Sequence, residues 1–374
     1  MNLICASSVT FAAPAFAPLG ELTLLPEGEI TPERVRDADA VITRSKTRLD
    51  RALFEGSRVQ FAGTCTAGTD HADAEGLSAL GIHFASAPGC NANAVSEYVV
   101  AALLEAHADH GFTFAGKTLG IVGHGEVGSR VARKATALGM KVLRNDPPKA
   151  AEGASGPWTN LDDLLASSDV LTLHVPLVET GSWPTRNLLS AERLATMKPG
   201  AVLINACRGE VLDGPAAAAA RRSGRLSWLV LDVWDPEPDV PLEVMAEADL
   251  ATPHIAGHSV EGKVNGTRQI LEALCAHFQV RHEWDPLPLM PPPLSERVSL
   301  PGEGDFETRL RHALRSCYEL REDDRALRRA DGPPGKLFTQ LRRNYRDRRE
   351  FSATTVTELR RDEREIYAAL GFRV

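Results

Sequence analysis

The sequence predicts an α/β protein with doubly wound parallel sheets, and two observations support that fold class. Short apolar runs alternate with helix-length segments over most of the chain, which is the element order of β-α-β folds. Most of the later runs are apolar throughout rather than alternating, as parallel strands covered on both faces require. The length of 374 residues suffices for two or three domains with proper cores. We therefore expect two doubly wound parallel-sheet domains, Rossmann-like or flavodoxin-like.

The expected strands fall into two series along the chain. The first lies at residues 3–7, 22–25, 40–43, 59–64 and 82–85, and the second at 118–122, 141–144, 170–175, 201–205 and 228–233. Expected helices include 126–138 and 214–223, with longer connector helices at 94–110 and at about 259–278. Five prolines among residues 284–293 block helix and ladder continuation, and so predict a linker.

The composition changes beyond this linker, which indicates a separate C-terminal module. Residues 295–374 contain 18 Lys and Arg, all but one of them Arg, against 15 Asp and Glu. That tail carries a net charge of +3, whereas the preceding residues sum to −11. An acidic protein is a poor candidate for bulk nucleic-acid binding. A DNA-binding tail stays open as an alternative, although its interleaved acidic residues argue against it.

Several other classes of protein are excluded. A charged fraction of 25% with ample Val, Leu and Ile argues against disorder, and no run of 18 uncharged apolar residues predicts a membrane span. Residues 11–17 look like a signal-peptide cleavage region, but the first basic residue is Arg34, so the basic region that should precede it is missing. Six scattered cysteines without a CxxC motif fit reduced thiols of a cytoplasmic protein.

A glycine-rich loop follows the expected strand at 118–122. Gly123, Gly125 and Gly128 form a GxGxxG motif that allows a tight turn, close approach of a pyrophosphate and close helix–strand packing. The helix after it would present free N–H groups and its positive end to phosphates. Asp146 ends the next strand, where a carboxylate can accept both hydrogen bonds of a ribose diol and repel a 2′-phosphate. The loop therefore predicts an NAD site rather than an NADP site.

Charged and titratable residues also follow three later strands. Arg208 lies in NACRG, Asp232 and Glu237 lie in LDVWDPEP, and His254 lies in TPHIAG. Ligands of open α/β sheets bind at the carboxyl ends of the strands, so we expect these side chains at one site. An imidazole can take the proton of a substrate hydroxyl, a carboxylate can fix its tautomer, and a planar guanidinium can clamp a carboxylate.

These motifs, in this order with the glycine loop, resemble the D-isomer-specific 2-hydroxyacid dehydrogenase family over roughly residues 1–285. The resemblance implies that His254 is the catalytic base, that Glu237 hydrogen-bonds it, and that Arg208 binds the substrate carboxylate. It implies that Asp232 orients the nicotinamide carboxamide. We expect a substrate-binding domain at 1–95 and 255–285, and an NAD-binding domain at 96–254.

Further segments resemble the erythronate-4-phosphate dehydrogenase branch of this family, namely residues 61–71, 87–97, 256–267, 318–324 and 342–351. This resemblance implies NAD-dependent oxidation of 4-phospho-D-erythronate, a step of pyridoxal phosphate biosynthesis. It implies a homodimer formed through a small α+β C-terminal domain at 286–374, with residues 342–349 supplying inter-subunit ion pairs or reaching a phosphate. The implied substrate contacts are Ser45, Thr66 and His258. The implied cofactor contacts are Gly123, Gly125, Glu126, Val127, Gly128, Asp146, Val175, Ala206, Cys207, Arg208, Asp232 and Gly257.

The chain departs from that branch at two places, and two alternatives stay open. His258 stands where the branch typically has Tyr, and Ala206 and Cys207 stand where it usually has a Ser or Thr. The alternatives are another dehydrogenase of the family, such as a phosphoglycerate dehydrogenase or glyoxylate/hydroxypyruvate reductase, and an NAD-sensing protein without relevant turnover. The spacing of His254 and His258 resembles a metal-ligand pair, but no third ligand accompanies it, so we expect no metal.

Overall fold

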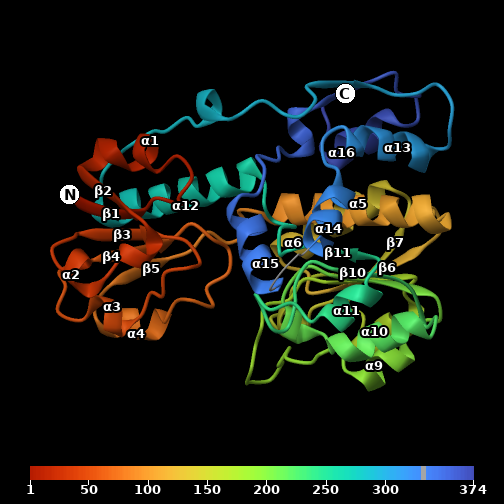
Figure 1. Ribbon diagram of the computed structural model, residues 1–374, viewed down its shortest axis with the longest axis horizontal. Coiled ribbons are helices and arrows are strands. Elements are labelled where there is room, and N and C mark those ends of the chain that lie inside the picture. Colours follow the sequence, from red (N-terminus) through yellow and green to blue (C-terminus); the bar gives the residue numbers. More distant parts are fainter. Residues whose placement is uncertain (330–333) are drawn as a thin grey trace. The chain divides into compact units, whose positions relative to one another are not determined.

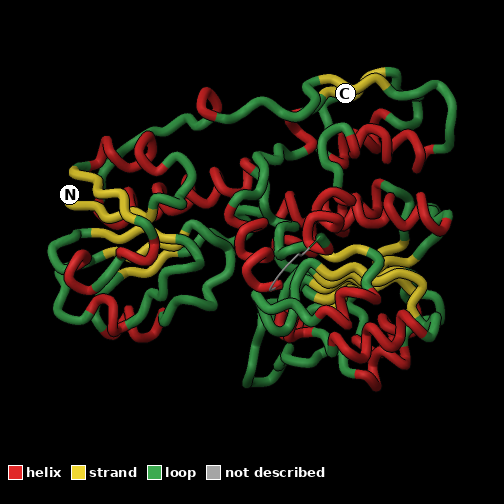
Figure 2. Tube along the Cα trace, viewed as in Figure 1, coloured by secondary structure: helices red, strands yellow, loops and turns green. Residues whose placement is uncertain are grey.

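The computed structural model describes residues 1–329 and 334–374, which divide into two compact units. Unit 1 consists of Met1–Asn91 and Ser259–Pro291, and unit 2 consists of Ala92–His258 and Pro292–Val374. Figure 2 shows one main sheet in each unit with helices around it, and a separate short pair of strands near the C-terminus. Within the described ranges, no helix is both long enough and apolar enough to cross a membrane.

Unit 1 contains a five-stranded parallel sheet in the order β2-β1-β3-β4-β5. This is the flavodoxin-like order of a doubly wound fold. The strands are β1 (Asn2–Ala6), β2 (Glu21–Leu25), β3 (Ala40–Thr43), β4 (Phe61–Thr64) and β5 (His83–Ala85). The helices are α1 (Ala12–Phe16), α2 (Pro32–Val35), α3 (Arg51–Phe54), α4 (Ala74–Ala79) and the long α12 (Val260–Phe278), which packs against β4. The chain thus returns to complete this unit after passing through unit 2.

Unit 2 contains a six-stranded parallel sheet in the order β11-β10-β9-β8-β6-β7. Arg144 on β7 also forms a parallel bridge to Trp158, which extends the sheet to the Rossmann order. The strands are β6 (Thr118–Val122), β7 (Lys141–Asn145), β8 (Val170–Leu173), β9 (Ala201–Asn205), β10 (Leu226–Leu231) and β11 (Leu250–Ala251). The helices are α5 (Ala92–His110), α6 (Glu126–Ala137), α7 (Pro147–Ala151), α8 (Leu161–Ser167), α9 (Ala191–Thr196), α10 (Gly214–Arg222) and α11 (Leu242–Glu247).

Both faces of this sheet are buried, because successive side chains of a strand point to opposite faces. Val202, Ile204 and Val230 belong to one apolar core, whereas Leu203 and Leu229 belong to the other. Helices α5 and α6 cover the first face, and α9, α10 and α11 cover the second (Figure 1). Burial of both faces of the sheet therefore explains why these strands are apolar throughout, as the sequence predicted.

The C-terminal segment belongs to unit 2 and packs as a further layer over α5 and α6 (Figure 1). A parallel pair of short strands, β12 (Arg297–Ser299) and β13 (Thr355–Thr357), accompanies its helices. These helices are α13 (Phe306–Arg315), α14 (Leu320–Arg328), α15 (Pro334–Arg343) and α16 (Arg364–Leu370). Leu310, Leu314 and Tyr367 of this segment join the core of α5 and α6.

Ion pairs within the chain account for much of the arginine in this segment. Arg311 and Arg321 both bind Glu105 of α5, at 2.8 and 3.0 Å. Arg309 pairs with Glu363 at 2.8 Å and is only 1% exposed. Buried pairs of this kind need good geometry to offset desolvation. The tail's positive charge is thus largely matched by acidic groups of unit 2.

The ten expected strands are present, each within a few residues of its expected bounds, and the α/β fold class is confirmed. β11 is not among these ten, because a strand of two residues gives no periodic signal, although His254 was expected to follow a strand at this point of the chain. The proline-rich linker contains one short 3₁₀ turn, Leu287–Leu289.

Candidate active site

All six strands of the unit 2 sheet run parallel, so the segments that follow them meet at one edge. The glycine loop follows β6, Asp146 follows β7, and Val175 follows β8. Residues 206–208 follow β9, Asp232 follows β10, and His254 lies three residues beyond β11. The topology thus brings to one sheet edge most of the residues singled out in the sequence.

The nucleotide loop, residues 123–128, is shaped by its glycines. Gly123 has φ +88°, and a Cβ there would lie 2.4 Å from the backbone oxygen of His174. A Cβ on Gly128 would lie 2.1 Å from the backbone oxygen of Gly123. At Gly125, by contrast, a Cβ would meet no atom within 4 Å. The loop is therefore compressed at both ends and open in the middle, beside the N-terminus of α6, as an NAD pyrophosphate requires.

Asp146 is held at the end of β7 by backbone N–H groups. Its carboxylate accepts hydrogen bonds from the N–H of His124 at 2.8 Å and of Lys149 at 3.2 Å, the second of which caps α7. The Lys149 ammonium in turn donates to the backbone oxygen of His124 at 2.8 Å. These bonds tie the nucleotide loop to the strand where the ribose-binding carboxylate of a Rossmann fold is expected.

Arg208 follows β9 in a loop that lies directly against the Trp234 backbone. A Cβ on Gly209 would lie 2.0 Å from the carbonyl of Trp234, so only glycine allows this approach. The side-chain amide of Asn205 donates to the backbone oxygen of Arg208 at 3.0 Å, which fixes the turn. Burial raises the pKa of the neighbouring Cys207 thiol to about 11, and Cys207 therefore remains a neutral thiol near neutral pH.

Glu237 and His254 form a hydrogen-bonded pair. Nδ1 of His254 lies 2.9 Å from Oε2 and 3.2 Å from Oε1 of Glu237. Burial by itself raises the pKa of the Glu237 carboxyl, but the hydrogen bond and the charge of His254 outweigh it and place this pKa below its ordinary value of 4.5. An ionised Glu237 fixes the Nδ1–H tautomer, which leaves Nε2 of His254 to accept a proton.

The histidine loop, residues 252–258, is held by the buried carboxylate of Asp232. Its Oδ1 accepts from the backbone N–H of Ile255 at 2.8 Å, and its Oδ2 from that of Ala256 at 2.9 Å. The Thr252 hydroxyl also donates to Oδ1, at 2.6 Å. His254 itself has φ 55°, a left-handed backbone that is strained for a residue with a side chain. Asp232 therefore supports the conformation of the loop that carries the imidazole.

The residues expected to bind substrate lie in both units. Ser45 follows β3 and is exposed, and Thr66 follows the neighbouring strand β4, so both lie at the carboxyl edge of the unit 1 sheet. The Thr66 hydroxyl donates to the backbone oxygen of Gly68 at 3.0 Å and contacts the Thr64 hydroxyl at 2.9 Å. Gly257 and His258 end the histidine loop in unit 2, where the His258 ring meets the edge of Tyr345.

Several supporting residues escaped the sequence analysis. The buried Tyr98 hydroxyl of α5 pairs with the Thr252 hydroxyl at 2.7 Å, and the Trp234 indole donates to the Thr252 backbone oxygen at 3.0 Å. Arg348 of the C-terminal segment donates to the backbone oxygen of Ala256 at 2.8 Å. Trp234 and Thr252 lie inside motifs that were recognised, and Arg348 lies in the segment 342–349 that was expected to contact another subunit or a phosphate, whereas no motif marks Tyr98.

Two arginines of the tail have partners within the chain. Arg346 binds Asp323 at 2.7 Å, and Arg348 donates to the histidine loop. The inter-subunit or phosphate-binding role expected of residues 342–349 stays a prediction.

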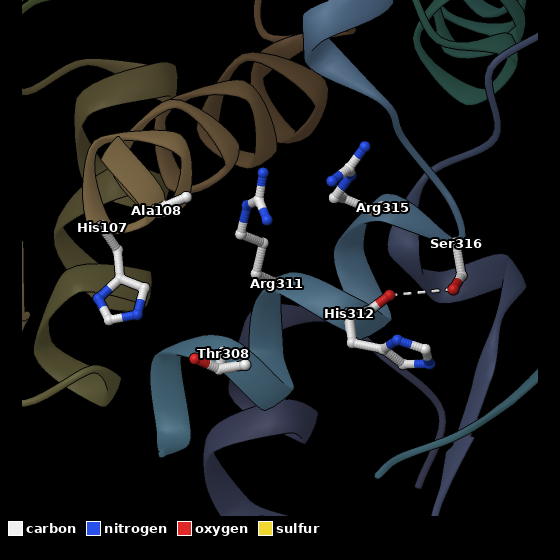
Figure 3. Close-up of a pocket in the computed structure, with 7 residues that line it drawn as sticks. All are labelled: His107, Ala108, Thr308, Arg311, His312, Arg315 and Ser316. Carbon is white, nitrogen blue, oxygen red and sulfur yellow. Dashed lines mark hydrogen bonds between the residues drawn. The ribbon is translucent and has the colours of Figure 1, made fainter. Parts of the chain in front are cut away.

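A cavity of about 660 Å³ lies away from the sheet edge, between α5 and α13 (Figure 3). Its basic lining residues are already engaged: Arg311 pairs with Glu105, and Arg315 with Glu319. Within the described residues, no group of three or more His, Cys, Asp or Glu side chains could hold a metal ion.

Two families match separate parts of the chain. The D-isomer specific 2-hydroxyacid dehydrogenase, NAD binding domain, matches residues 91–256. A domain of unknown function (DUF3410) matches residues 289–371, which cover most of the C-terminal segment. Fold and site thus define a dehydrogenase of the D-2-hydroxyacid class, and its cofactor is NAD.

Comparison with individual relatives narrows the family to which the chain belongs. It is 42% identical over 356 residues to the erythronate-4-phosphate dehydrogenase of Cronobacter sakazakii, covering 95% of this chain and 94% of that relative. It is 42% identical over 373 residues to that of Photorhabdus laumondii, covering 100% and 99%. The chain therefore belongs to the erythronate-4-phosphate dehydrogenase family. Among solved structures, an NAD⁺-bound 3-phosphoglycerate dehydrogenase of Entamoeba histolytica is 25% identical with a TM-score of 0.64, covering 75% of this chain and 95% of that one.

Proposed function

We propose that the protein oxidises 4-phospho-D-erythronate at C2 to 2-oxo-3-hydroxy-4-phosphobutanoate, with NAD⁺ as the oxidant, in the biosynthesis of pyridoxal phosphate. The observation that supports this most strongly is identity of 40–43% with erythronate-4-phosphate dehydrogenases over nearly the whole chain, tail included. NAD, when bound, takes up the hydride that leaves C2 of the substrate.

The chain's own residues divide the remaining work. Nε2 of His254 takes the proton of the C2 hydroxyl, while the Glu237 carboxylate on Nδ1 stabilises the imidazolium that forms. The planar guanidinium of Arg208 binds the substrate carboxylate and polarises the developing carbonyl. In the reverse direction His254 returns its proton to the carbonyl oxygen.

We propose the cofactor contacts on the same grounds. The open space at Gly125 and the N-terminus of α6 fit a pyrophosphate, and Asp146 fits the ribose diol. Asp232 receives two backbone N–H bonds from the histidine loop and would orient the nicotinamide carboxamide from there. The other proposed contacts are Gly123, Glu126, Val127, Gly128, Val175, Ala206, Cys207, Arg208 and Gly257.

We further propose Ser45, Thr66 and His258 as substrate contacts, their hydroxyls and imidazole facing carboxylate or phosphate oxygens. The domain proposal assigns substrate binding to 1–95 and 255–285, NAD binding to 96–254, and dimerisation to 286–374. The protein would act as a cytoplasmic homodimer that binds no nucleic acid. Sedimentation of the full chain, and of a truncation at about residue 290, tests the dimer.

Steady-state formation of the 2-oxo acid product by the purified protein tests the proposed function. We expect turnover of 4-phospho-D-erythronate well above turnover of 3-phosphoglycerate or glycerate, measured with and without added 2-oxo acids as electron acceptors. No turnover of 4-phospho-D-erythronate beside good turnover of another 2-hydroxy acid would refute the substrate. His254→Ala should abolish turnover while sparing NAD binding, and equal loss of both would contradict its role as the base.

A further inference from the structure

Ala256 of the histidine loop is held from two sides by buried charged groups. Its N–H donates to Oδ2 of Asp232 at 2.9 Å, and its carbonyl accepts from Nη2 of Arg348 at 2.8 Å. Asp232 comes from the end of β10, whereas Arg348 comes from the C-terminal segment, 92 residues further along the chain than Ala256. This clamp lies two residues beyond His254.

The Arg348 guanidinium is buried and donates to the histidine loop. Arg348 is 3% exposed, and the Cζ atom of its guanidinium lies 4.2 Å from the ring centroid of Tyr318. Within the described residues, Nε and Nη1 have no hydrogen-bond partner. Burying a cation is costly, and the bond to the Ala256 carbonyl is the hydrogen bond that its guanidinium makes. The guanidinium is therefore directed at the histidine loop.

The same C-terminal segment contacts the backbone on both sides of His254. Before the histidine, the N–H of Ala251 donates to Oδ1 of Asp324 at 2.8 Å. After it, the His258 ring meets the Tyr345 ring edge-on, with 5.7 Å between centroids. The tail thus contacts the chain both before and after His254, within its own unit.

A loop of this kind needs such support. The left-handed backbone of His254, with φ 55°, is strained for a residue with a side chain, and such strain persists only where the surroundings enforce it. The Asp232 carboxylate accepts hydrogen bonds from two N–H groups of the loop, and Arg348 of the tail donates one to the Ala256 carbonyl.

We propose that Arg348 is a positioning residue of the catalytic centre, whose hydrogen bond to the Ala256 carbonyl keeps His254 aligned with Glu237. The C-terminal segment is then part of the catalytic apparatus of its own subunit, in addition to any role between subunits. This inference rests on the proposed function, because it assigns His254 as the base.

The test compares two buried arginines of the tail. Arg309 is 1% exposed and, like Arg348, donates to a backbone carbonyl, but its partners Glu363 and Glu358 lie within the tail itself. Arg348→Met and Arg309→Met each remove a buried cation of the tail, and Arg309→Met also leaves the Glu363 carboxylate without its arginine partner. Arg348→Lys keeps the charge but loses the planar fork. For each full-length variant, kcat, KM, NAD affinity, the pH profile of kcat/KM and thermal unfolding are measured.

We expect Arg348→Met to lower kcat by about 10- to 100-fold, since a catalytic group displaced by about 1 Å can cost that much, while NAD affinity changes by less than about 3-fold. The pH profile of kcat/KM should move, because the His254–Glu237 geometry changes. Arg348→Lys should lie between Arg348→Met and the unaltered protein. Arg309→Met should lower the unfolding temperature but leave kcat and the pH profile unchanged.

Equal losses of kcat in Arg348→Met and Arg309→Met, or an unchanged kcat and pH profile in a folded Arg348→Met, would overturn the proposal. If Arg348→Met does not fold, Arg348→Lys decides the matter: an unaltered kcat and pH profile in that variant overturns it. The comparison uses whichever 2-hydroxy acid the unaltered protein oxidises, so a wrong substrate does not obscure it. Should no 2-hydroxy acid be oxidised, the proposed function fails by itself. The proton NMR titration of the His254 ring then tests the positioning without turnover, and a titration left unchanged by Arg348→Lys overturns it.

Discussion

The nucleotide loop and the histidine loop lie at the same edge of one sheet, yet they keep their shapes by different means. The nucleotide loop relies on missing side chains, because Gly123 and Gly128 approach other backbone atoms too closely for a Cβ. The histidine loop has a side chain at its strained position, and charged groups hold it: Asp232 on its N–H groups and Arg348 on the Ala256 carbonyl. Both loops depend on segments that are distant in the chain. The nucleotide loop meets the His174 backbone through a missing side chain, whereas the histidine loop is held by buried charged side chains.

The largest effect on kcat is expected from a change at the hydrogen bond between His254 and Glu237. Glu237→Gln replaces an acceptor that fixes the Nδ1–H tautomer with an amide that can also donate to Nδ1. We expect kcat to fall by about 10²- to 10⁴-fold, the range that general acid–base catalysis contributes. NAD affinity, measured by fluorescence titration, should stay near its original value. A kcat within a few-fold of the unaltered enzyme would show that the pair does not act as a unit.

Loss of a hydrogen bond between the histidine loop and Asp232 should give the next largest effect. Asp232→Asn keeps the shape of the side chain but has one acceptor oxygen to face the N–H groups of Ile255 and Ala256. A buried N–H left without an acceptor costs roughly 1–3 kcal/mol, so urea unfolding should show a loss of that order and kcat should fall. Asp146→Asn is the matched control, because it also leaves one of two N–H groups without a carboxylate oxygen, but Asp146 is only half-buried, so its stability loss should be smaller. Equal losses would remove the distinction between the loops.

Two alanine substitutions in the nucleotide loop separate shape from ligand binding. Gly128→Ala places a Cβ 2.1 Å from the Gly123 backbone oxygen, so unfolding experiments should show roughly 1–3 kcal/mol of destabilisation. Gly125→Ala meets no atom within 4 Å and should fold normally, but NAD affinity should fall by at least about ten-fold, or 1.4 kcal/mol. If Gly125→Ala binds NAD normally, the pyrophosphate does not approach this residue.

The smallest effect concerns the acid stability of the Glu237–His254 pair. The folded pKa of Glu237 lies below its ordinary value of 4.5, so the ionised carboxylate stabilises the fold above that pH. This contribution is lost as the pH falls through the folded pKa. The difference in unfolding free energy between the unaltered protein and Glu237→Gln should be at most about 1 kcal/mol near neutrality and should vanish in acid. A difference that grows in acid would contradict the direction of the shift.

The residues of the site that could be predicted from the sequence are those that directly follow the strands of the sheet. The ends of parallel strands share an edge, so recognising the strands was enough to group Arg208, Asp232 and His254. The glycine loop could likewise be predicted, because its GxGxxG motif spans only six residues, although the close approach of Gly123 to the His174 backbone is seen only in the structure. Ser45 and Thr66 could be proposed only by resemblance, since a hydroxyl in a loop has no periodic or steric signature.

The sequence by itself determined the sheets, the nucleotide loop and the catalytic residue types, because apolar periodicity and glycine placement act over short stretches of chain. Only the tertiary structure decided what holds the histidine loop, since Tyr98, Asp232 and Arg348 come together from segments up to 250 residues apart. It also decided the meaning of the arginine-rich tail, which packs against unit 2 and pairs with Glu105 and Asp323. Charge composition records how many arginines are present, whereas their partners depend on burial and distance.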